Sequence, residues 1–146
     1  MDAEAKGYKN SWLFTLQAPS LIPFLQYAQN RELRKKMCMA YNSRAYKDAF
    51  DNQEIIKTIL RLKKERSVLL GFKNYAEYIL EERMAQNSNG VFQFLDALLV
   101  PSKKAVEKDL AELRDFKKSL DGNDDIKPWD FSYYAEKLKE KKYKFN

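Results

Sequence analysis

Histidine is absent from this chain of 146 residues, and that absence excludes more chemistry than any other feature of the sequence. Without an imidazole there is no His-Glu-x-x-His zinc helix, no Ser-His or Cys-His nucleophile and no histidine general base. Cysteine occurs once, as Cys38, which excludes an internal disulfide. Because Cys38 stands between Met37 and Met39, we expect an inert buried thiol and not a nucleophile.

Glycine and proline are scarce, with four of each, and no apolar run approaches the roughly 20 residues that cross a bilayer. The first six residues lack the basic flank and apolar centre of a signal peptide. The composition is 45% hydrophobic and 33% charged, which favours packed helices over a β-sandwich or a disordered tail. We therefore expect one all-α domain over residues 1–146, cytoplasmic and without a membrane partner.

The formal net charge is +6 and the pI is about 9.2, which raises the question of nucleic-acid binding. The lysines are largely interleaved with acidic residues, as on a solvated helix face, so we expect no nucleic-acid partner. The alternative hypothesis is a free-standing helical interaction module that binds an acidic partner or nucleic acid. A salt-dependent affinity for polyanions would favour that alternative.

The chain is organised around residues 51–85, which are typical of a helical hairpin. A capping box is predicted at its start, in which Asp51 accepts a hydrogen bond from the backbone N–H near Glu54 and Glu54 reaches back to the Asp51 N–H. An apolar stripe at helical spacing is expected to face the core, opposite a cationic face. The stripe consists of Ile55, Ile59, Leu62 and Leu69, widened by Ile56, Leu60 and Leu70.

The turn of the hairpin is marked by Gly71, which stands where a helix needs a left-handed residue to end. Phe72 can then fold back onto the last turn of the first helix. Asn74 with Glu77 repeats the cap pattern and predicts a second helix through Ala85. Two helices joined by so short a turn are expected to pack against each other.

The alternation of apolar residues from Trp12 to Leu16, stopped by Pro19, predicts one short strand. No second run has a comparable period of two, so the backbone groups of this strand must pair elsewhere. The remaining chain predicts an array of antiparallel amphipathic helices. These helices are expected to begin at a Ser20 cap, at Asn30, at a Ser88 cap and at Pro128. The helix from Asn30 is expected to run to about Ala45, with an apolar stripe of Leu33, Met37, Ala40 and Tyr41. Beyond Pro101, Ser102 is expected to begin either a second helix or a bent continuation.

Residues 121–125 are the clearest loop, and their spacing does not suit an EF-hand. The helix after Pro128 carries Trp129, Tyr133 and Tyr134. The residues alone favour the interpretation that these three side chains are core aromatics on an amphipathic helix.

The run Leu69 to Tyr78, with Leu80-Glu81 and Met84-Ala85, resembles a segment of the thimet-oligopeptidase family of zinc metallopeptidases, in the branch of peptidyl-dipeptidase Dcp and oligopeptidase A. Three further stretches agree in the same order. They are residues 12–24, residues 30–45, and Pro128-Trp129-Asp130 with Tyr133-Tyr134. The likeness therefore covers nearly the whole chain.

The resemblance implies a parent enzyme that hydrolyses short peptides with a zinc-activated water. It also implies that this chain is a fragment upstream of the zinc-binding helix and is inactive alone, with no catalytic, cofactor-binding or metal residue to carry over. Because the family encloses a channel between helical lobes, Trp129, Tyr133 and Tyr134 become candidates for the substrate-channel wall. Aromatics left uncovered in a fragment predict self-association, most simply as a homodimer.

Overall fold

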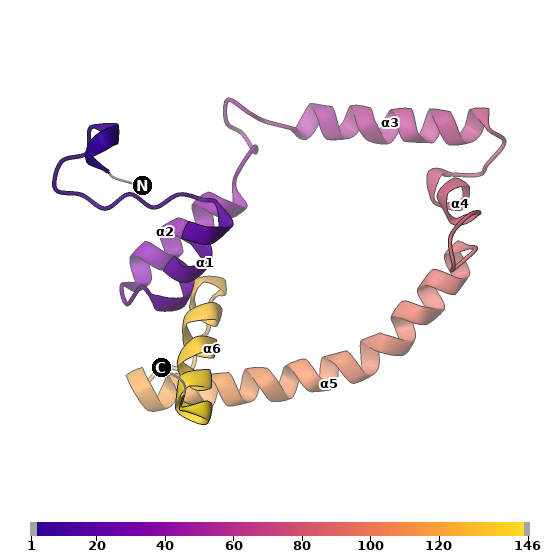
Figure 1. Ribbon diagram of the computed structural model, residues 1–146. Coiled ribbons are helices and arrows are strands. Elements are labelled where there is room, and N and C mark those ends of the chain that lie inside the picture. Colours follow the sequence, from indigo (N-terminus) through magenta and orange to yellow (C-terminus); the bar gives the residue numbers. More distant parts are fainter. Residues whose placement is uncertain (1–2, 145–146) are drawn as a thin grey trace. The chain divides into compact units, whose positions relative to one another are not determined.

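A computed structural model describes residues 3–144 of the chain (Figure 1). Within those residues the secondary structure is helical, with no β-strand, which confirms the all-α prediction. None of the described helices is both long and apolar enough to cross a membrane. The α-helices are α1 (Ala18–Tyr27), α2 (Arg31–Asn42), α3 (Gln53–Leu69), α4 (Tyr75–Leu80), α5 (Ser88–Asp121) and α6 (Pro128–Tyr143).

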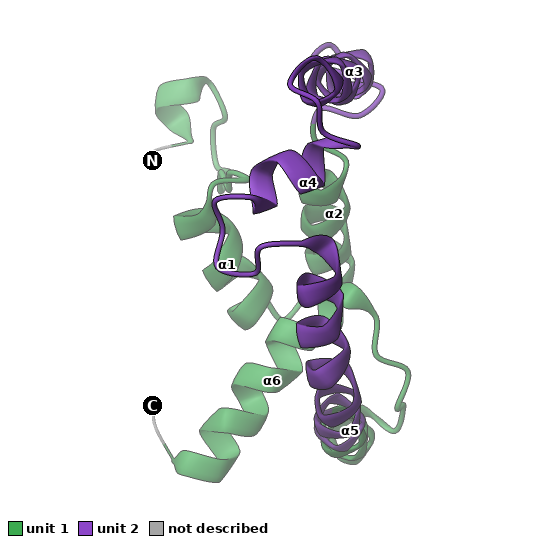
Figure 2. Cartoon of the chain, turned by 90° about the vertical axis from the view of Figure 1, so that its right-hand side faces the viewer, with its two compact units in different colours: residues 1–44, 110–146 green, residues 45–109 purple. Residues whose placement is uncertain are grey.

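The chain divides into two compact units, which Figure 2 shows in different colours. The terminal unit consists of residues 1–44 and 110–146 and contains α1, α2, α6 and the end of α5. The middle unit consists of residues 45–109 and contains α3, α4 and the start of α5.

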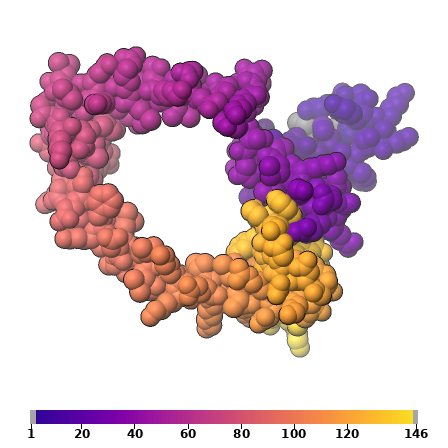
Figure 3. All heavy atoms as spheres, turned by 180° about the vertical axis from the view of Figure 1, so that it is seen from behind, coloured from indigo at the N-terminus to yellow at the C-terminus, as the bar shows by residue number. Residues whose placement is uncertain are grey.

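In the terminal unit, α1, α2 and α6 pack on one another, and Figure 3 shows the atoms of α1 and α2 in contact with those of α6. α2 begins at the predicted cap, because the Asn30 Oδ1 accepts a hydrogen bond from the Leu33 N–H at 3.1 Å. α6 begins at Pro128, as predicted. The apolar side chains buried in this unit are Ala3, Leu21, Cys38, Leu113, Phe116 and Tyr134.

The predicted strand at Trp12–Leu16 is not confirmed. Residues 11–15 are neither helical nor turned, but no described segment forms a ladder with them. A strand needs a partner for its backbone groups, and this sequence offers no second run of the same kind. α1 begins at Ala18, before Ser20, whose hydroxyl accepts a hydrogen bond from the Thr15 N–H at 2.9 Å instead of capping the helix.

α3 ends at a glycine, as predicted. Gly71 has φ of 83°, in the left-handed region. Its N–H donates to the Val68 carbonyl at 3.0 Å, and the Phe72 N–H donates to the Ser67 carbonyl at 2.9 Å. These two bonds together form a Schellman motif.

α3 and α4 contact each other, as predicted, but an antiparallel hairpin is not confirmed. α4 begins at Asn74, whose Oδ1 accepts a hydrogen bond from the Glu77 N–H at 3.0 Å. The Arg66 guanidinium donates to the Tyr78 hydroxyl at 3.0 Å, and the rings of Phe72 and Tyr78 lie 5.2 Å apart. Aromatic and cationic side chains therefore hold the two helices together.

Only the first half of the capping box predicted at the start of α3 is confirmed. The Asp51 carboxylate accepts a hydrogen bond from the Gln53 N–H, next to Glu54, at 2.9 Å. Glu54 does not reach back, because it forms an ion pair with Lys57 at 2.6 Å. The hydrogen bond from Gln53 is the main cause that lowers the pKa of Asp51.

α4 is shorter than predicted, since it ends at Leu80 and not at Ala85. The Arg83 N–H donates to the Leu80 carbonyl at 3.0 Å, which is a turn and not a continued α-helix. The residues after Leu80 are Glu-Glu-Arg, which offer no apolar face that packing could use to extend the helix.

The start of α5 also differs from the prediction. Asn87 supplies the cap, because its Oδ1 accepts a hydrogen bond from the Gly90 N–H at 2.9 Å, while the Ser88 hydroxyl donates to Glu77. Of the two alternatives at Pro101, the structure shows the continuation, since α5 runs through Pro101 to Asp121 without interruption.

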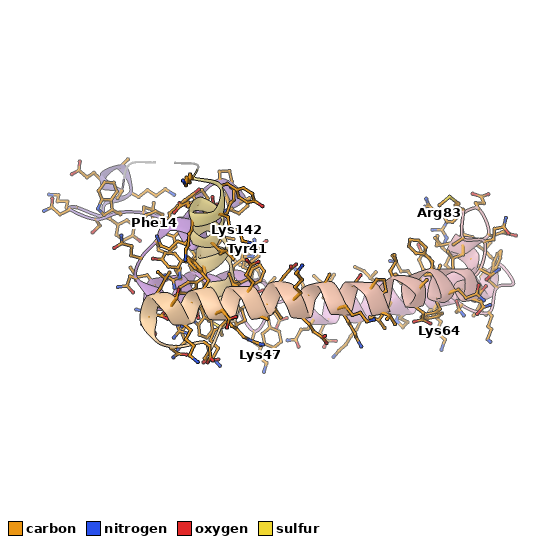
Figure 4. All side chains as sticks on the ribbon, turned by 90° about the horizontal axis from the view of Figure 1, so that it is seen from below. Phe14, Tyr41, Lys47, Lys64, Arg83 and Lys142 are labelled. Atoms are coloured by element: carbon orange, nitrogen blue, oxygen red, sulfur yellow. The ribbon has the colours of Figure 1, made fainter. Side chains whose placement is uncertain are left out.

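The apolar stripes of the middle unit are not buried among the described residues. In α3, Ile55, Ile59 and Leu62 are 57%, 45% and 51% exposed. Side chains likewise stand out along α5 (Figure 4), where Phe92 and Leu95 are exposed. The stripes are present as predicted, but the antiparallel array that would cover them is not confirmed.

We predict that Gly71→Ala lowers the free energy of unfolding by about 1 kcal/mol, because a β-carbon disfavours the left-handed region. A steric clash with other residues is not the cause, since nothing lies within 4 Å of the position that a β-carbon would take. Gly71→Asn is the control, because asparagine tolerates this conformation and should lose less. Denaturant unfolding of the 146-residue chain measures both, and an unchanged midpoint for Gly71→Ala would contradict the role.

Candidate functional site

The most densely bonded group of side chains lies in the terminal unit, around Asp130 in the first turn of α6. Asp130 is fully buried. Arg31 approaches its carboxylate through Nε at 2.9 Å and Nη2 at 2.6 Å, and Arg34 through Nη2 at 3.1 Å. The Lys127 N–H, at the start of α6, donates to the same carboxylate at 3.1 Å. A buried carboxylate therefore has several charged and neutral donors, as burial requires.

Arg34 is 1% exposed and uses its other donors on backbone carbonyls. Its Nη1 donates to Ala28 at 2.8 Å and to Gln29 at 3.0 Å, and its Nε donates to Trp129 at 3.1 Å. Those carbonyls follow the end of α1 and lie in the first turn of α6. One guanidinium thus joins three helices.

The electrostatics of Asp130 reflect two opposing effects. Burial acts to raise its pKa, but the hydrogen bonds from Arg31, Lys127 and Arg34 outweigh burial and lower the pKa below its ordinary value of 3.8. The hydrogen bond to Asp130 is likewise the main cause that raises the pKa of Arg31. Both groups are held in their charged forms.

This buried ionic group was missed by sequence reasoning, which placed the buried face of α2 on Leu33, Met37, Ala40 and Tyr41. In the structure Leu33 is 46% exposed, and the buried residues of α2 are Arg34 and Cys38. A hydrophobicity pattern places an arginine on the solvent-exposed face of a helix. The wrong face of α2 was therefore predicted to be buried. The available signal was the i, i+3 pair of arginines at 31 and 34, together with Asp130 in the motif that carries the resemblance.

The three aromatics predicted to line a substrate channel surround this ionic group. The Arg34 guanidinium lies 4.0 Å from the centroid of the Tyr133 ring, and that ring meets Tyr134 edge to face at 5.1 Å. Arg31 lies 5.7 Å from the Trp129 ring centroid. The three side chains are brought together, and their place in a channel wall stays a prediction.

Tyr134 is the least accessible of the three, at 6% exposed. Its hydroxyl donates to the Asp121 carboxylate at 2.7 Å, and Lys117 binds the same carboxylate at 3.1 Å. Burial, followed by the bond to Asp121, strongly raises the pKa of the Tyr134 hydroxyl. Tyr134 therefore stays neutral and serves to fasten α6 to the end of α5.

Trp129 has a different local chemistry. It is half-buried, and its indole Nε1 is buried without a hydrogen-bond partner among the described residues. A buried donor without an acceptor costs about 1 to 3 kcal/mol, so this N–H is the unsatisfied group of the cluster.

The described residues do not fit a zinc centre. The sequence has no histidine, Cys38 is buried, and residues 3–144 contain no group of three or more Cys, Asp or Glu side chains that could hold a metal ion. The carboxylates of the site, Asp130 and Asp121, are each engaged by cations. The paired carboxylates of the site order the helices around them.

The chain matches known peptidases over most of its length. The sequence model of Peptidase family M3 matches residues 24–146, a range that includes α2 through α6. This match places the chain among peptidases. The chain belongs to peptidase family M3, the thimet oligopeptidase family that the sequence motifs resemble.

Relatives of the family align across nearly the whole chain. Oligopeptidase A of Escherichia coli K12 is 40% identical over 146 residues, which cover 97% of this chain and 21% of that protein. Oligopeptidase A of Haemophilus influenzae is 39% identical over 149 residues, covering 99% and 22%. The dipeptidyl carboxypeptidase of E. coli K12 is 28% identical over 142 residues, covering 97% and 21%. The chain thus spans about a fifth of the length of these relatives.

We predict that Asp130→Asn destabilises the terminal unit by about 3 to 5 kcal/mol, because it leaves the Arg34 guanidinium buried without a counter-charge. Chemical denaturation followed by circular dichroism measures the loss. Glu136→Gln, on the same helix, is the matched control. Glu136 pairs with the exposed Lys139 and accepts a hydrogen bond from Gln26 at 3.5 Å, so the change should alter stability by less than about 1 kcal/mol. Equal losses in the two variants would show that the Asp130 network is not special.

The same network predicts acid sensitivity. Because the folded pKa of Asp130 is lowered, its contribution is complete above the unfolded value of 3.8 and is lost as the pH falls through the folded pKa. The free energy of unfolding should therefore decrease below about pH 4. In the Asp130→Asn variant the free energy of unfolding should fall less steeply as the pH falls. Part of the acid sensitivity should remain, because the pKa of Asp121 is also lowered. Superimposable pH profiles would contradict the assignment.

Proposed function

We propose that this chain is the helical segment of a zinc-dependent oligopeptidase that hydrolyses short peptides, and that it precedes the zinc-binding helix of that enzyme. The observation that carries the proposal is the family match over residues 24–146. The higher identity to oligopeptidase A than to the dipeptidyl carboxypeptidase favours the oligopeptidase side of the family.

The part that this chain plays is structural. Since its residues do not fit a zinc centre, the metal of the proposed parent would be held by residues outside the 146. The exposed apolar stripes on α3 and α5 support the same proposal, because a larger helical enzyme would supply the surfaces that cover them.

We further propose that Trp129, Tyr133 and Tyr134 contribute to the wall of the substrate channel in the parent. Trp129 and Tyr133 are the better placed of the three, because they are only half-buried and Tyr134 is fully engaged by Asp121.

The natural reading frame tests the proposal directly. If the frame continues beyond Asn146 into a His-Glu-x-x-His motif, and the whole protein cleaves a quenched fluorescent peptide in a chelator-sensitive manner, the proposal stands. A frame without that motif would overturn it. Salt-dependent binding of the 146-residue chain to a polyanion such as heparin would instead favour the alternative of an interaction module.

We predict that the 146-residue chain alone neither retains zinc nor hydrolyses peptides, because it has no imidazole ligand. The measurement is metal analysis after dialysis against zinc, followed by a quenched-peptide assay with added zinc. Stoichiometric zinc together with chelator-sensitive cleavage would contradict this prediction.

A further inference from the structure

The two units differ in what they bury. Residues 45–109 all lie within the part of the chain that the structure describes, and among them only Ser67 is buried. Every apolar side chain buried among the described residues belongs to the terminal unit, as do the other buried polar residues, Arg34, Lys117 and Asp130. A folded unit is built around buried apolar side chains. The middle unit therefore has no apolar core among its own residues, and the terminal unit has one.

The bonds that hold α6 against α1 and α2 join two distant parts of the sequence. Arg34 and Asp130, whose side chains bond at 3.1 Å, are 96 residues apart. Arg34 also donates through Nε to the Trp129 carbonyl at 3.1 Å, and Gln26 donates to Glu136 at 3.5 Å. These residues all belong to the terminal unit. The middle unit enters these bonds only as a covalent connection.

Each side of the contact is ordered by bonds within its own part of the chain. The Arg34 guanidinium is held by the carbonyls of Ala28 at 2.8 Å and Gln29 at 3.0 Å, which lie in the same part as α2. The Asp130 carboxylate accepts a hydrogen bond from the Lys127 N–H at 3.1 Å, at the start of its own helix. Groups that are already ordered lose less freedom when they bind.

A long connection does little to bring the two ends of the chain together. A short flexible linker gives an effective concentration of about 1 mM, and longer ones give less. For the packed arrangement of α1, α2 and α6 to be the main state, the ends must bind each other with a dissociation constant about 100-fold below that concentration. The expected dissociation constant of the separated ends is thus on the order of 10 μM or lower.

We propose that residues 1–44 and residues 110–146 recognise each other as separate chains, and that the middle unit is not needed for their association. The partner of α1 and α2 is α6 with the end of α5, and the buried pair of Arg34 and Asp130 is the centre of the contact. The middle unit is then a connecting insertion that can unfold or be cut while the terminal unit stays folded. The proposal is independent of the proposed enzyme function.

Cutting the 146-residue chain on both sides of α3 and α4 tests the proposal. Lys47 and Arg83, which Figure 4 labels, are exposed and lie between helices. The recognition sequence of a site-specific protease is inserted after each of them, and the purified chain is cleaved. Sedimentation velocity at about 100 μM, tenfold above the expected dissociation constant, should show residues 1–47 and 84–146 moving together. Residues 48–83 should sediment separately.

Substitutions in the cleaved chain test the centre of the contact. Asp130→Asn should raise the dissociation constant by about 100-fold or more, because Arg34 loses its counter-charge. Glu140→Gln is the matched control, since it removes an exposed carboxylate from the same helix and should leave association unchanged. Arg31→Lys keeps the charge of a half-exposed side chain and so preserves the fold. It should raise the dissociation constant roughly tenfold, because lysine cannot bind a carboxylate through two nitrogens.

Four results would overturn the proposal. Residues 1–47 and 84–146 separate after cleavage, or residues 48–83 stay bound to them. Asp130→Asn and Arg31→Lys associate as tightly as Glu140→Gln. The pieces dissociate in about 0.5 M NaCl, which would show that exposed charges hold them, because salt screens buried pairs much less.

Discussion

The terminal unit depends on one constraint, which is that the buried carboxylate of Asp130 must be paired. Removing a carboxylate from water costs several kcal/mol, and only well-placed charged donors offset that cost. Arg31 and Arg34 of α2 supply them, and Arg34 also binds the carbonyls of Ala28 and Gln29 after α1. A shift of α6 by a single residue would leave these charges buried and unpaired. The network therefore fixes the relative position of α1, α2 and α6.

The aromatic side chains take their positions from this network. Tyr133 lies under the Arg34 guanidinium because Arg34 is held by Asp130. A second ionic contact, from Lys117 and Tyr134 to Asp121, fastens the far side of α6 to α5. The proposed channel residues are thus oriented by groups that would never touch a substrate. Any change in the ionic network would move the aromatics as well, so the two effects have to be separated by experiment.

The parts of the fold that follow from local chemistry could be predicted from the sequence. The Asn30 and Asn74 caps, the left-handed Gly71 and the start of α6 at Pro128 each depend on residues within one turn. The buried face of α2 could not be predicted, because the partner that makes burial of Arg34 favourable lies 96 residues away in the sequence. The end of α4 was missed for a related reason. Helical pattern alone does not extend a helix that has nothing to pack on.

The middle unit shows a second limit of prediction from hydrophobic periodicity. The apolar stripe on α3 was predicted to face a core, yet Ile55 and Leu62 are about half exposed. Periodicity records that a helix has a partner surface, and says nothing about where that surface lies in the chain. Side-chain stripes require a partner of matching shape, which a longer family member would provide.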